Sequence, residues 1–228
     1  MVEAVLLEWE GVLADTRRLR RDALRRAMAA EGVAHTLADD DEQVRGLGVR
    51  GAVGVVLRHM GSSDATLAEL LEMRARREFA AMMAQGLVLA DGAVKFVERL
   101  QSRARVLLVS RASRDECTGL LRLAGLEHAV SAVVCADDVA EAAPCVPLYR
   151  HALARVARYP GGAAGGAVAI VDRRPAIRAA REAGTRVIVV GAPAYEAMDA
   201  DMAVDRLDAV CLDAESFEPN AALRVREA

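Results

Sequence analysis

Two acidic residues, Glu8 and Glu10, stand one position apart directly after a short apolar run, and Gly11 follows them at once. A short continuous apolar run ended by a glycine is typical of a buried strand that leads into a turn. Open α/β sheets bind their ligands at the carboxyl ends of such strands. We therefore predict a strand over residues 4–8 and an active or binding site at its end.

This stretch also resembles a known motif. Residues 5–16 read VLLEWEGVLADT, which resembles the first motif of the haloacid dehalogenase superfamily, D-x-D-G-x-L-x-D-T/S. The glycine, Asp15 and Thr16 match that motif. Both of its leading aspartates are replaced by glutamates, Glu8 and Glu10.

A second and a third motif of the same superfamily can be placed further along the chain. Ser110 closes a predicted strand at residues 106–109 and matches the serine or threonine of the second motif. Residues 132–149 resemble the third motif, D-D-V followed by K-P-x-P-D-x-Y, with Pro144 and Tyr149 retained. The lysine position holds Ala143 and the last aspartate position holds Pro147.

The fourth motif, E-D-S-x-x-G-I-x-A-A-x-x-A-G, is similar to residues 171–184. Asp172 is retained, while Val171 replaces the glutamate and Arg173 replaces the serine. Four motifs in this order cover nearly the whole chain. The resemblance is closest to the branch of phosphoglycolate phosphatase and β-phosphoglucomutase, which carries a helical cap domain.

The resemblance implies a role for each matching residue. Glu8 would be the nucleophile that attacks phosphorus, and Glu10 would be the general acid and base. Mg²⁺ would be held by Glu8, by Glu10 through its backbone carbonyl, and by Asp172, and Ser110 would bind the phosphoryl oxygens. Mg²⁺ is the one cofactor that the resemblance implies.

The substitutions in the motifs weaken this expectation. A glutamate carries its oxygens about one C–C bond farther from the backbone, and a ~1 Å misplacement can cost roughly 100-fold in rate. Loss of the charge-stabilising lysine at Ala143 typically costs on the order of 100- to 1000-fold. Arg111 and Arg173 adjoin motif positions and are the candidates to bind phosphate in its place, because arginine grips phosphate oxygens as a fork.

Two functional hypotheses follow. In the first, the chain is a pseudoenzyme, a phosphatase-like protein with a degenerate site that is silent or very weak and retains a cleft for binding a small phosphorylated molecule or a protein partner. In the second, it is a Mg²⁺-dependent phosphomonoester hydrolase that uses Glu8 as its nucleophile. The first rests on the joint loss of both aspartates and the lysine. The second rests on the negative charge kept at Glu8, Glu10 and Asp172.

Arg50 and Lys95 are two further basic residues outside the motifs. Arg50 falls near the segment of the cap that faces the substrate in relatives, so it is a candidate substrate contact, but we favour the alternative that it is an ordinary surface arginine. Lys95 is the only lysine of the chain, and it falls at a position that relatives usually expose.

The pattern of apolar residues predicts an α/β fold, a Rossmann-like doubly wound parallel sheet with an inserted α-helical cap. Residues 16–86 contain helical periodicity and no strand pattern, so we assign them to the cap, with residues 1–15 and 87–228 as the core. In the cap we expect a helix at 16–31, two short helices within 39–60, and a long helix capped by Ser62 or Ser63. In the core we expect strands near 106–109, 132–135, 168–171, 187–190 and 209–212, alternating with helices at 113–124, 146–157 and 175–183.

Composition limits the functional classes. The formal net charge is −3, with 30 basic and 33 acidic residues, which argues against nucleic-acid or membrane partners. The arginines at 17–26 are expected to form a solvated helix face. No run of 18 apolar residues is present, and the four cysteines and four histidines lack metal-ligand spacing. We expect a cytoplasmic protein with reduced thiols.

Overall fold

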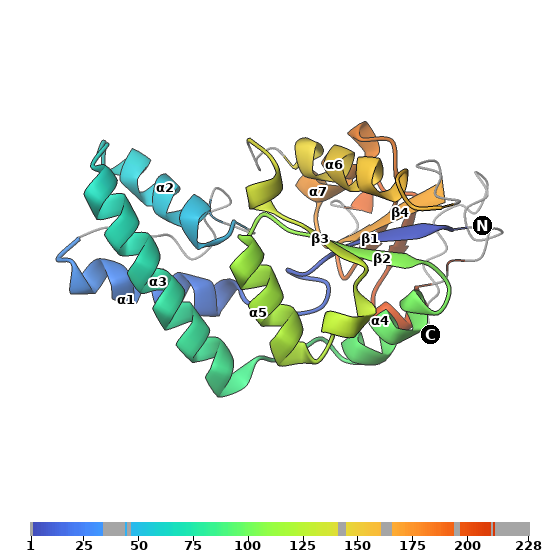
Figure 1. Cartoon of the computed structure of the whole chain (residues 1–228), viewed down its shortest axis with the longest axis horizontal. Coiled ribbons are helices and arrows are strands. Elements are labelled where there is room, and N and C mark those ends of the chain that lie inside the picture. Colours follow the sequence, from blue (N-terminus) through green and yellow to red (C-terminus); the bar gives the residue numbers. More distant parts are fainter. Residues whose placement is uncertain are drawn as a thin grey trace.

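The computed structural model describes residues 2–33, 44, 47–140, 145–160, 166–193, 197–210 and 212. Its centre is a parallel sheet of six strands in the order β3-β2-β1-β4-β5-β6 (Figure 1). The strands are β1 (Ala4–Glu8), β2 (Arg105–Val109), β3 (Ala132–Val134), β4 (Ala167–Val171), β5 (Arg186–Val190) and β6 (Met202–Val204). The predicted α/β fold class is therefore confirmed.

Strand β1 lies near the middle of the sheet, and every one of its residues is buried. It pairs with β2 on one side and β4 on the other, in parallel register. Successive side chains of a strand point to opposite faces. Accordingly Val5 and Leu7 pack in one hydrophobic core and Ala4 and Leu6 in a second core on the other face. The continuous apolar run thus reflects burial on both faces.

Helices cover both faces of the sheet (Figure 1). Helices α4 (Ala93–Gln101) and α5 (Arg114–Ala124) contribute side chains such as Phe96 and Leu121 to the first core. Helices α6 (Val146–Val156) and α7 (Arg174–Glu182) contribute Leu148 and Ile177 to the second. This three-layer arrangement is that of a Rossmann-like doubly wound fold.

Three further helices, α1 (Arg17–Ala30), α2 (Val49–His59) and α3 (Ala65–Gly86), lie beyond the carboxyl ends of the strands (Figure 1). The chain leaves for these helices after β1 and returns beside its point of departure. There the Ala90 amide donates to the Leu13 carbonyl at 2.8 Å, and Ala14 bridges to Leu89. We retain the division into a cap of residues 16–86 and a core as a proposal.

A buried ion pair joins this helical layer to the core. Arg20 of α1 places Nη1 2.5 Å from Oε1 of Glu116 in α5, and the two side chains are only 9% and 7% exposed. The Arg20 guanidinium also lies over the ring of Phe79 in α3, 4.4 Å from its centroid. The same Glu116 oxygen accepts from the Val49 amide at the start of α2 at 3.3 Å. The Glu116 carboxylate therefore binds α1 and the start of α2 directly, and α3 contacts the same ion pair through Phe79.

The start of α2 is pressed against the loop that follows β2. The Gly48 amide donates to the Arg111 carbonyl at 3.4 Å. A Cβ atom at Gly48 would lie 2.6 Å from the Cα atom of Ala112, so only glycine permits this approach. The helical layer and the core are thus in direct backbone contact beside the end of β2.

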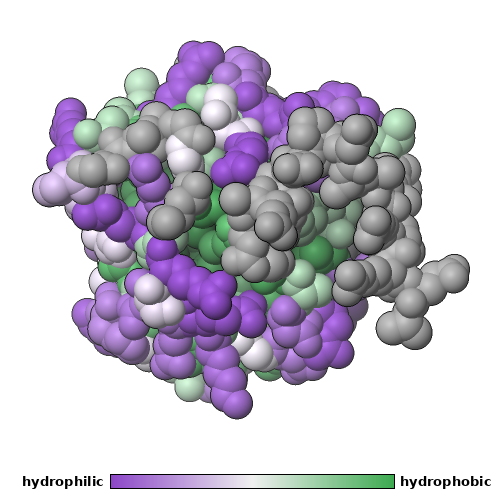
Figure 2. Space-filling model, turned by 90° about the vertical axis from the view of Figure 1, so that its right-hand side faces the viewer, coloured by the Kyte–Doolittle hydropathy of each residue, from purple (hydrophilic) through white to green (hydrophobic). Residues whose placement is uncertain are grey.

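Figure 2 shows the opposite end of the molecule, where the strands begin. Among the residues described there, hydrophilic side chains border the face and apolar ones appear toward its middle. Among the described residues, no helix is both long and apolar enough to cross a membrane.

Two expectations about element ends were wrong. Helix α3 is capped by Asp64 rather than by Ser62 or Ser63, because the Asp64 side chain accepts from the Leu67 amide at 3.1 Å. The predicted last strand at 209–212 is absent from the described part of that segment. The sixth strand is β6 at Met202–Val204, which pairs with β5.

The arginine-rich face of α1 is also only partly solvated, contrary to expectation. Arg20 is 8% exposed, and it packs with Ala23, Leu24 and Ala27 on the buried side of the helix. The neighbouring Arg18 is exposed. The first of the two short helices expected within 39–60 falls mostly outside the described residues, and α2 is the second.

Replacing Arg20 by alanine should destabilise the protein strongly, because Glu116 would remain buried without its counter-charge. We expect the free energy of unfolding to fall by about 3–5 kcal/mol, measured by urea denaturation. Arg26→Ala is the matched control, because Arg26 lies on the same helix in an exposed pair with Glu78 and should cost about 0–1 kcal/mol. Equal losses of unfolding free energy in the two variants would contradict the importance of the buried pair for stability.

Candidate functional site

The predicted site residues gather where three adjacent parallel strands end. Glu8 is the last residue of β1, Ser110 and Arg111 follow β2, and Asp172 and Arg173 follow β4. Because β2, β1 and β4 are neighbours in the sheet, their carboxyl ends meet at one edge. The topology therefore brings all five residues to the same end of the sheet, as the sequence predicted.

Glu8 is a buried acid. Its side chain accepts a hydrogen bond at Oε1 from the hydroxyl of Tyr149 in α6, at 3.0 Å, and the residue is 8% exposed. Burial raises the pKa of Glu8 from its usual 4.5 to about 7, against the opposing effects of Arg173, Tyr149 and Arg111. Burial thus favours the neutral form of this carboxyl far more than in an exposed glutamate.

Asp172 and Arg173 form an ion pair beside Glu8. The Arg173 Nε lies 3.4 Å from Asp172 Oδ1, and the two side chains are 9% and 8% exposed. Burial lowers the pKa of Arg173, but the negative charges of Glu8 and Asp172 outweigh it and the pKa is raised. The guanidinium is thus held as a cation by two carboxylates.

Arg111 supplies a second guanidinium in the same place. Burial lowers its pKa and the positive charge of Arg173 lowers it further, while Glu8 and Tyr149 act in the opposite direction. The Cys145 thiol interacts electrostatically with Glu8, Arg111 and Arg173, and burial raises the pKa of this thiol. Arg111 and Arg173 thus both interact electrostatically with Glu8, and their role in binding phosphate stays a prediction.

Ser110 is engaged with its own loop. Its Oγ accepts from the Ala112 amide at 3.1 Å, and its amide donates to the Val134 carbonyl of β3 at 2.9 Å. These two bonds fix the turn that follows β2 and present Arg111 beside it. A role for Ser110 in holding phosphate stays a prediction.

Glu10 is turned toward the start of α1. Its Oε1 accepts from the Thr16 amide at 2.8 Å and its Oε2 from the Thr16 hydroxyl at 2.5 Å. Burial raises the pKa of Glu10, although Arg20 and the two bonds from Thr16 oppose the rise. The second acid of the motif therefore fastens the turn to the helical layer.

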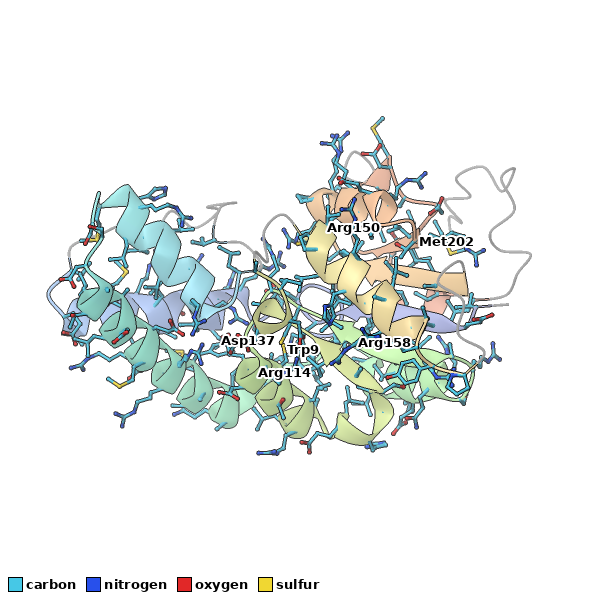
Figure 3. The ribbon with its side chains drawn as sticks, turned by 45° about the horizontal axis from the view of Figure 1, so that its top comes forward. Trp9, Arg114, Asp137, Arg150, Arg158 and Met202 are labelled. Atoms are coloured by element: carbon cyan, nitrogen blue, oxygen red, sulfur yellow. The ribbon has the colours of Figure 1, made fainter. Side chains whose placement is uncertain are left out.

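Trp9 separates the two acids and is 2% exposed. Its backbone carbonyl accepts from the amides of Leu13 and Ala14, at 2.9 and 3.2 Å, which closes the turn after β1. Figure 3 shows its side chain at the middle of the molecule, between the strand ends and the helical layer. The only tryptophan of the chain is thus an internal reporter for this site.

The aspartates of the third motif have a structural role at the start of α5. The Arg114 amide donates to Asp137 Oδ2 at 2.7 Å, and the Arg114 guanidinium pairs with Asp138 at 2.6 Å (Figure 3). Asp138 also accepts from the Cys135 amide at 2.9 Å. These bonds tie the end of β3 to the helix that carries Glu116.

The comparisons with known proteins agree with this geometry. Residues 5–190 match the family of haloacid dehalogenase-like hydrolases. A CbbY protein of Cereibacter sphaeroides is 31% identical over 199 residues, which span 83% of this chain and 84% of that protein. The chain belongs to the haloacid dehalogenase-like hydrolases.

Two solved structures are similar over almost the whole length. CbbY from Rhodobacter sphaeroides in complex with phosphate has a TM-score of 0.79 and 26% identity, covering 95% of this chain and 99% of its own. A variant of the same protein in complex with xylulose-1,5-bisphosphate has a TM-score of 0.78 and 26% identity, covering 96% and 100%. The family resemblance deduced from the four motifs is confirmed.

Haloacid dehalogenase-like hydrolases generally use Mg²⁺, and the residues present here fit that ion poorly. Mg²⁺ requires near-octahedral oxygen ligands at about 2.0–2.1 Å. Asp172 is instead paired with Arg173, Glu8 accepts from Tyr149, and Glu10 is bound to Thr16. Within the described residues, no three acidic, histidine or cysteine side chains are grouped so as to hold a metal.

Arg50 and Lys95 are both exposed, whereas the acids at the strand ends are buried or half-buried. The Arg50 side chain is 72% exposed and pairs with Glu72 of α3 at 3.1 Å, so its role as a substrate contact stays a prediction. Lys95 is exposed on α4. The position of the missing motif lysine, Ala143, lies outside the described residues.

Three participants were missed by the sequence reasoning. Tyr149 was recognised as part of the third motif but not as the partner of Glu8. Arg17 grips Asp15 through Nε and Nη2, at 2.7 and 2.6 Å, and its positive charge is felt by Asp172 and Glu10. Asp15 and Thr16 match the end of the first motif. That match was the signal in the sequence that could have indicated both the Arg17–Asp15 pair and the hydrogen bonds from Thr16 to Glu10.

The buried carboxyl of Glu8 should make the stability of the protein depend on pH. Its folded pKa is about 7 against a usual value of 4.5. The Glu8 carboxyl therefore makes its full contribution to the free energy of unfolding below about pH 4.5. This contribution is lost as the pH rises through about 7. A shift of this size corresponds to about 3 kcal/mol.

Glu8→Gln should remove this dependence. We expect the variant to match the wild type at pH 5 and to exceed its free energy of unfolding by up to about 3 kcal/mol at pH 8.5 in urea denaturation. Glu98→Gln, at an exposed position of α4, is the control and should change stability by less than about 0.5 kcal/mol at both pH values. A constant difference between wild type and Glu8→Gln across this range would refute the raised pKa.

Proposed function

We propose that this chain binds a small phosphate ester at the end of β1 and transfers its phosphoryl group very slowly or not at all. The observation that carries the proposal is the placement of two guanidinium groups, the half-buried Arg111 and the buried Arg173, within electrostatic range of the buried Glu8 carboxyl, whose pKa is raised by burial. Buried arginines bind phosphate oxygens strongly because the fork of N–H donors matches them.

The arrangement of the acids supports the weak-turnover part of the proposal. A nucleophilic carboxylate must be ionised and must lie about 3–3.5 Å from phosphorus in line with the leaving group. Glu8 carries the longer glutamate side chain, is buried, and accepts a hydrogen bond at Oε1 from the Tyr149 hydroxyl. Glu10 is the expected proton donor, but both of its side-chain oxygens accept hydrogen bonds from Thr16.

Sugar phosphates are the ligand class that we favour. The CbbY structures that this chain resembles contain phosphate and xylulose-1,5-bisphosphate. Arg17 adds a third guanidinium near Asp172 and Glu10, which would suit a ligand with more than one anionic group. A small phosphorylated molecule is thus a better match to these residues than a protein partner.

A second candidate function is the Mg²⁺-dependent hydrolysis of phosphomonoesters with Glu8 as nucleophile. One observation favours it: Glu8, Glu10 and Asp172 all remain acidic and all lie around the turn after β1. A Cβ atom at Gly11 would lie 1.9 Å from Asp172 Oδ2, so the Asp172 carboxylate rests against that turn. This function requires the ion pair of Asp172 with Arg173 to open.

Binding and hydrolysis predict opposite effects of Glu8→Gln. If the chain binds without turnover, removal of the negative charge should tighten the binding of inorganic phosphate and sugar bisphosphates. Arg111→Met should weaken it by about 10- to 100-fold, as expected for the loss of a charged hydrogen-bond donor. Trp9 fluorescence and titration calorimetry in the presence of EDTA would measure both changes.

Arg122→Met is the control for nonspecific charge effects, because Arg122 is an exposed arginine on α5 paired with Glu127. It should leave the dissociation constant unchanged. Phosphate release from the same ligands with millimolar Mg²⁺ would be assayed in parallel. Turnover by the wild type that disappears in Glu8→Gln would establish the hydrolase and overturn the binding proposal.

A further inference from the structure

Arg173 stands where the acids of this fold converge. Its guanidinium faces Asp172, with Nε 3.4 Å from Oδ1, and it interacts electrostatically with Glu8. All three side chains are less than about one tenth exposed, so solvent screens their interactions weakly. A positive charge of the chain itself therefore compensates the two carboxylates at the ends of β1 and β4.

Both oxygens of Asp172 have close neighbours. One of its oxygens, Oδ2, rests against the backbone of Gly11, where even a methyl group would be only 1.9 Å away. The other, Oδ1, is the oxygen that faces Arg173 Nε. The carboxylate thus lies between the turn after β1 and the guanidinium.

A divalent cation and this guanidinium would exclude one another. A magnesium ion at about 2.0–2.1 Å from Asp172 Oδ1, on the side that faces Arg173, would overlap the guanidinium, because Nε lies 3.4 Å from that oxygen. It would also add two positive charges next to an existing one in a poorly screened interior. Burying the ion without displacing Arg173 is therefore strongly unfavourable.

We propose that the Arg173 side chain takes the place of the divalent cation in this chain and blocks a latent metal site formed by Glu8, Asp172 and the backbone beside Gly11. The site is then neutralised from within the fold and needs no metal to hold its acids together. This inference concerns cation binding alone, and it stands whether or not the proposed phosphate binding is correct.

Shortening Arg173 should create metal binding. Titration of the whole protein with Mn²⁺, followed by the loss of the free-ion signal in electron paramagnetic resonance, should show no binding to the wild type at millimolar concentration. Arg173→Ser should bind one Mn²⁺ per chain, at least 10-fold more tightly, and Mg²⁺ should displace it. Adding Asp172→Asn to Arg173→Ser should abolish the gain.

Arg174→Ser is the matched control, because Arg174 is the next residue and pairs with Asp199 on the surface. It should bind no more Mn²⁺ than the wild type. Arg173→Gln removes the charge at nearly constant volume and serves if the serine variant does not fold, which near-ultraviolet circular dichroism would reveal. Stoichiometric Mn²⁺ binding by the wild type, or no gain in a folded Arg173 variant, would overturn the proposal.

Discussion

The ion pair between Arg20 and Glu116 is the interaction on which the arrangement of the helical layer depends. Two charges that are each less than one tenth exposed stabilise a fold only while they remain together, because either charge alone would be buried without compensation. Glu116 also receives the amide at the start of α2 and belongs to the capping box of α5. The position of three helices is therefore tied to one carboxylate.

This constraint reaches the candidate site through the first turn of α1. Arg20 lies one helical turn from Thr16, whose hydroxyl and amide hold both oxygens of Glu10. The acid that the motif assigns to proton transfer is consequently part of the contact between the helical layer and the sheet. Any motion of α1 away from the sheet would release Glu10, so the chemistry of that residue is coupled to the docking of α1.

Much of the fold was predictable because its signals are local. The strands β1, β2, β4 and β5 are continuous apolar runs, as burial on both faces requires, and parallel topology then places Glu8, Ser110 and Asp172 at one edge. Strand β6 was not predicted because it has only three residues, none of them buried. The apolar residues after it pack without pairing, as Val210 does in the core.

The bonding within the site was not predictable in the same way. Arg20 stands in a run of arginines that look alike in sequence, and only the position of Glu116, 96 residues away, distinguishes it. The same holds for Glu8 and Tyr149, which meet across 141 residues. The motif positions identified which residues would gather, whereas their partners depend on tertiary packing.

The scarcity of lysine has a practical consequence. A chain of 228 residues with one lysine, exposed on α4 at position 95, presents a single side-chain amine to acylating reagents. The charges of the site are all guanidinium or carboxyl groups, which such reagents leave intact. A fluorophore or a surface linker coupled at Lys95 would therefore mark the protein at one defined side chain without altering the acids and arginines at the strand ends.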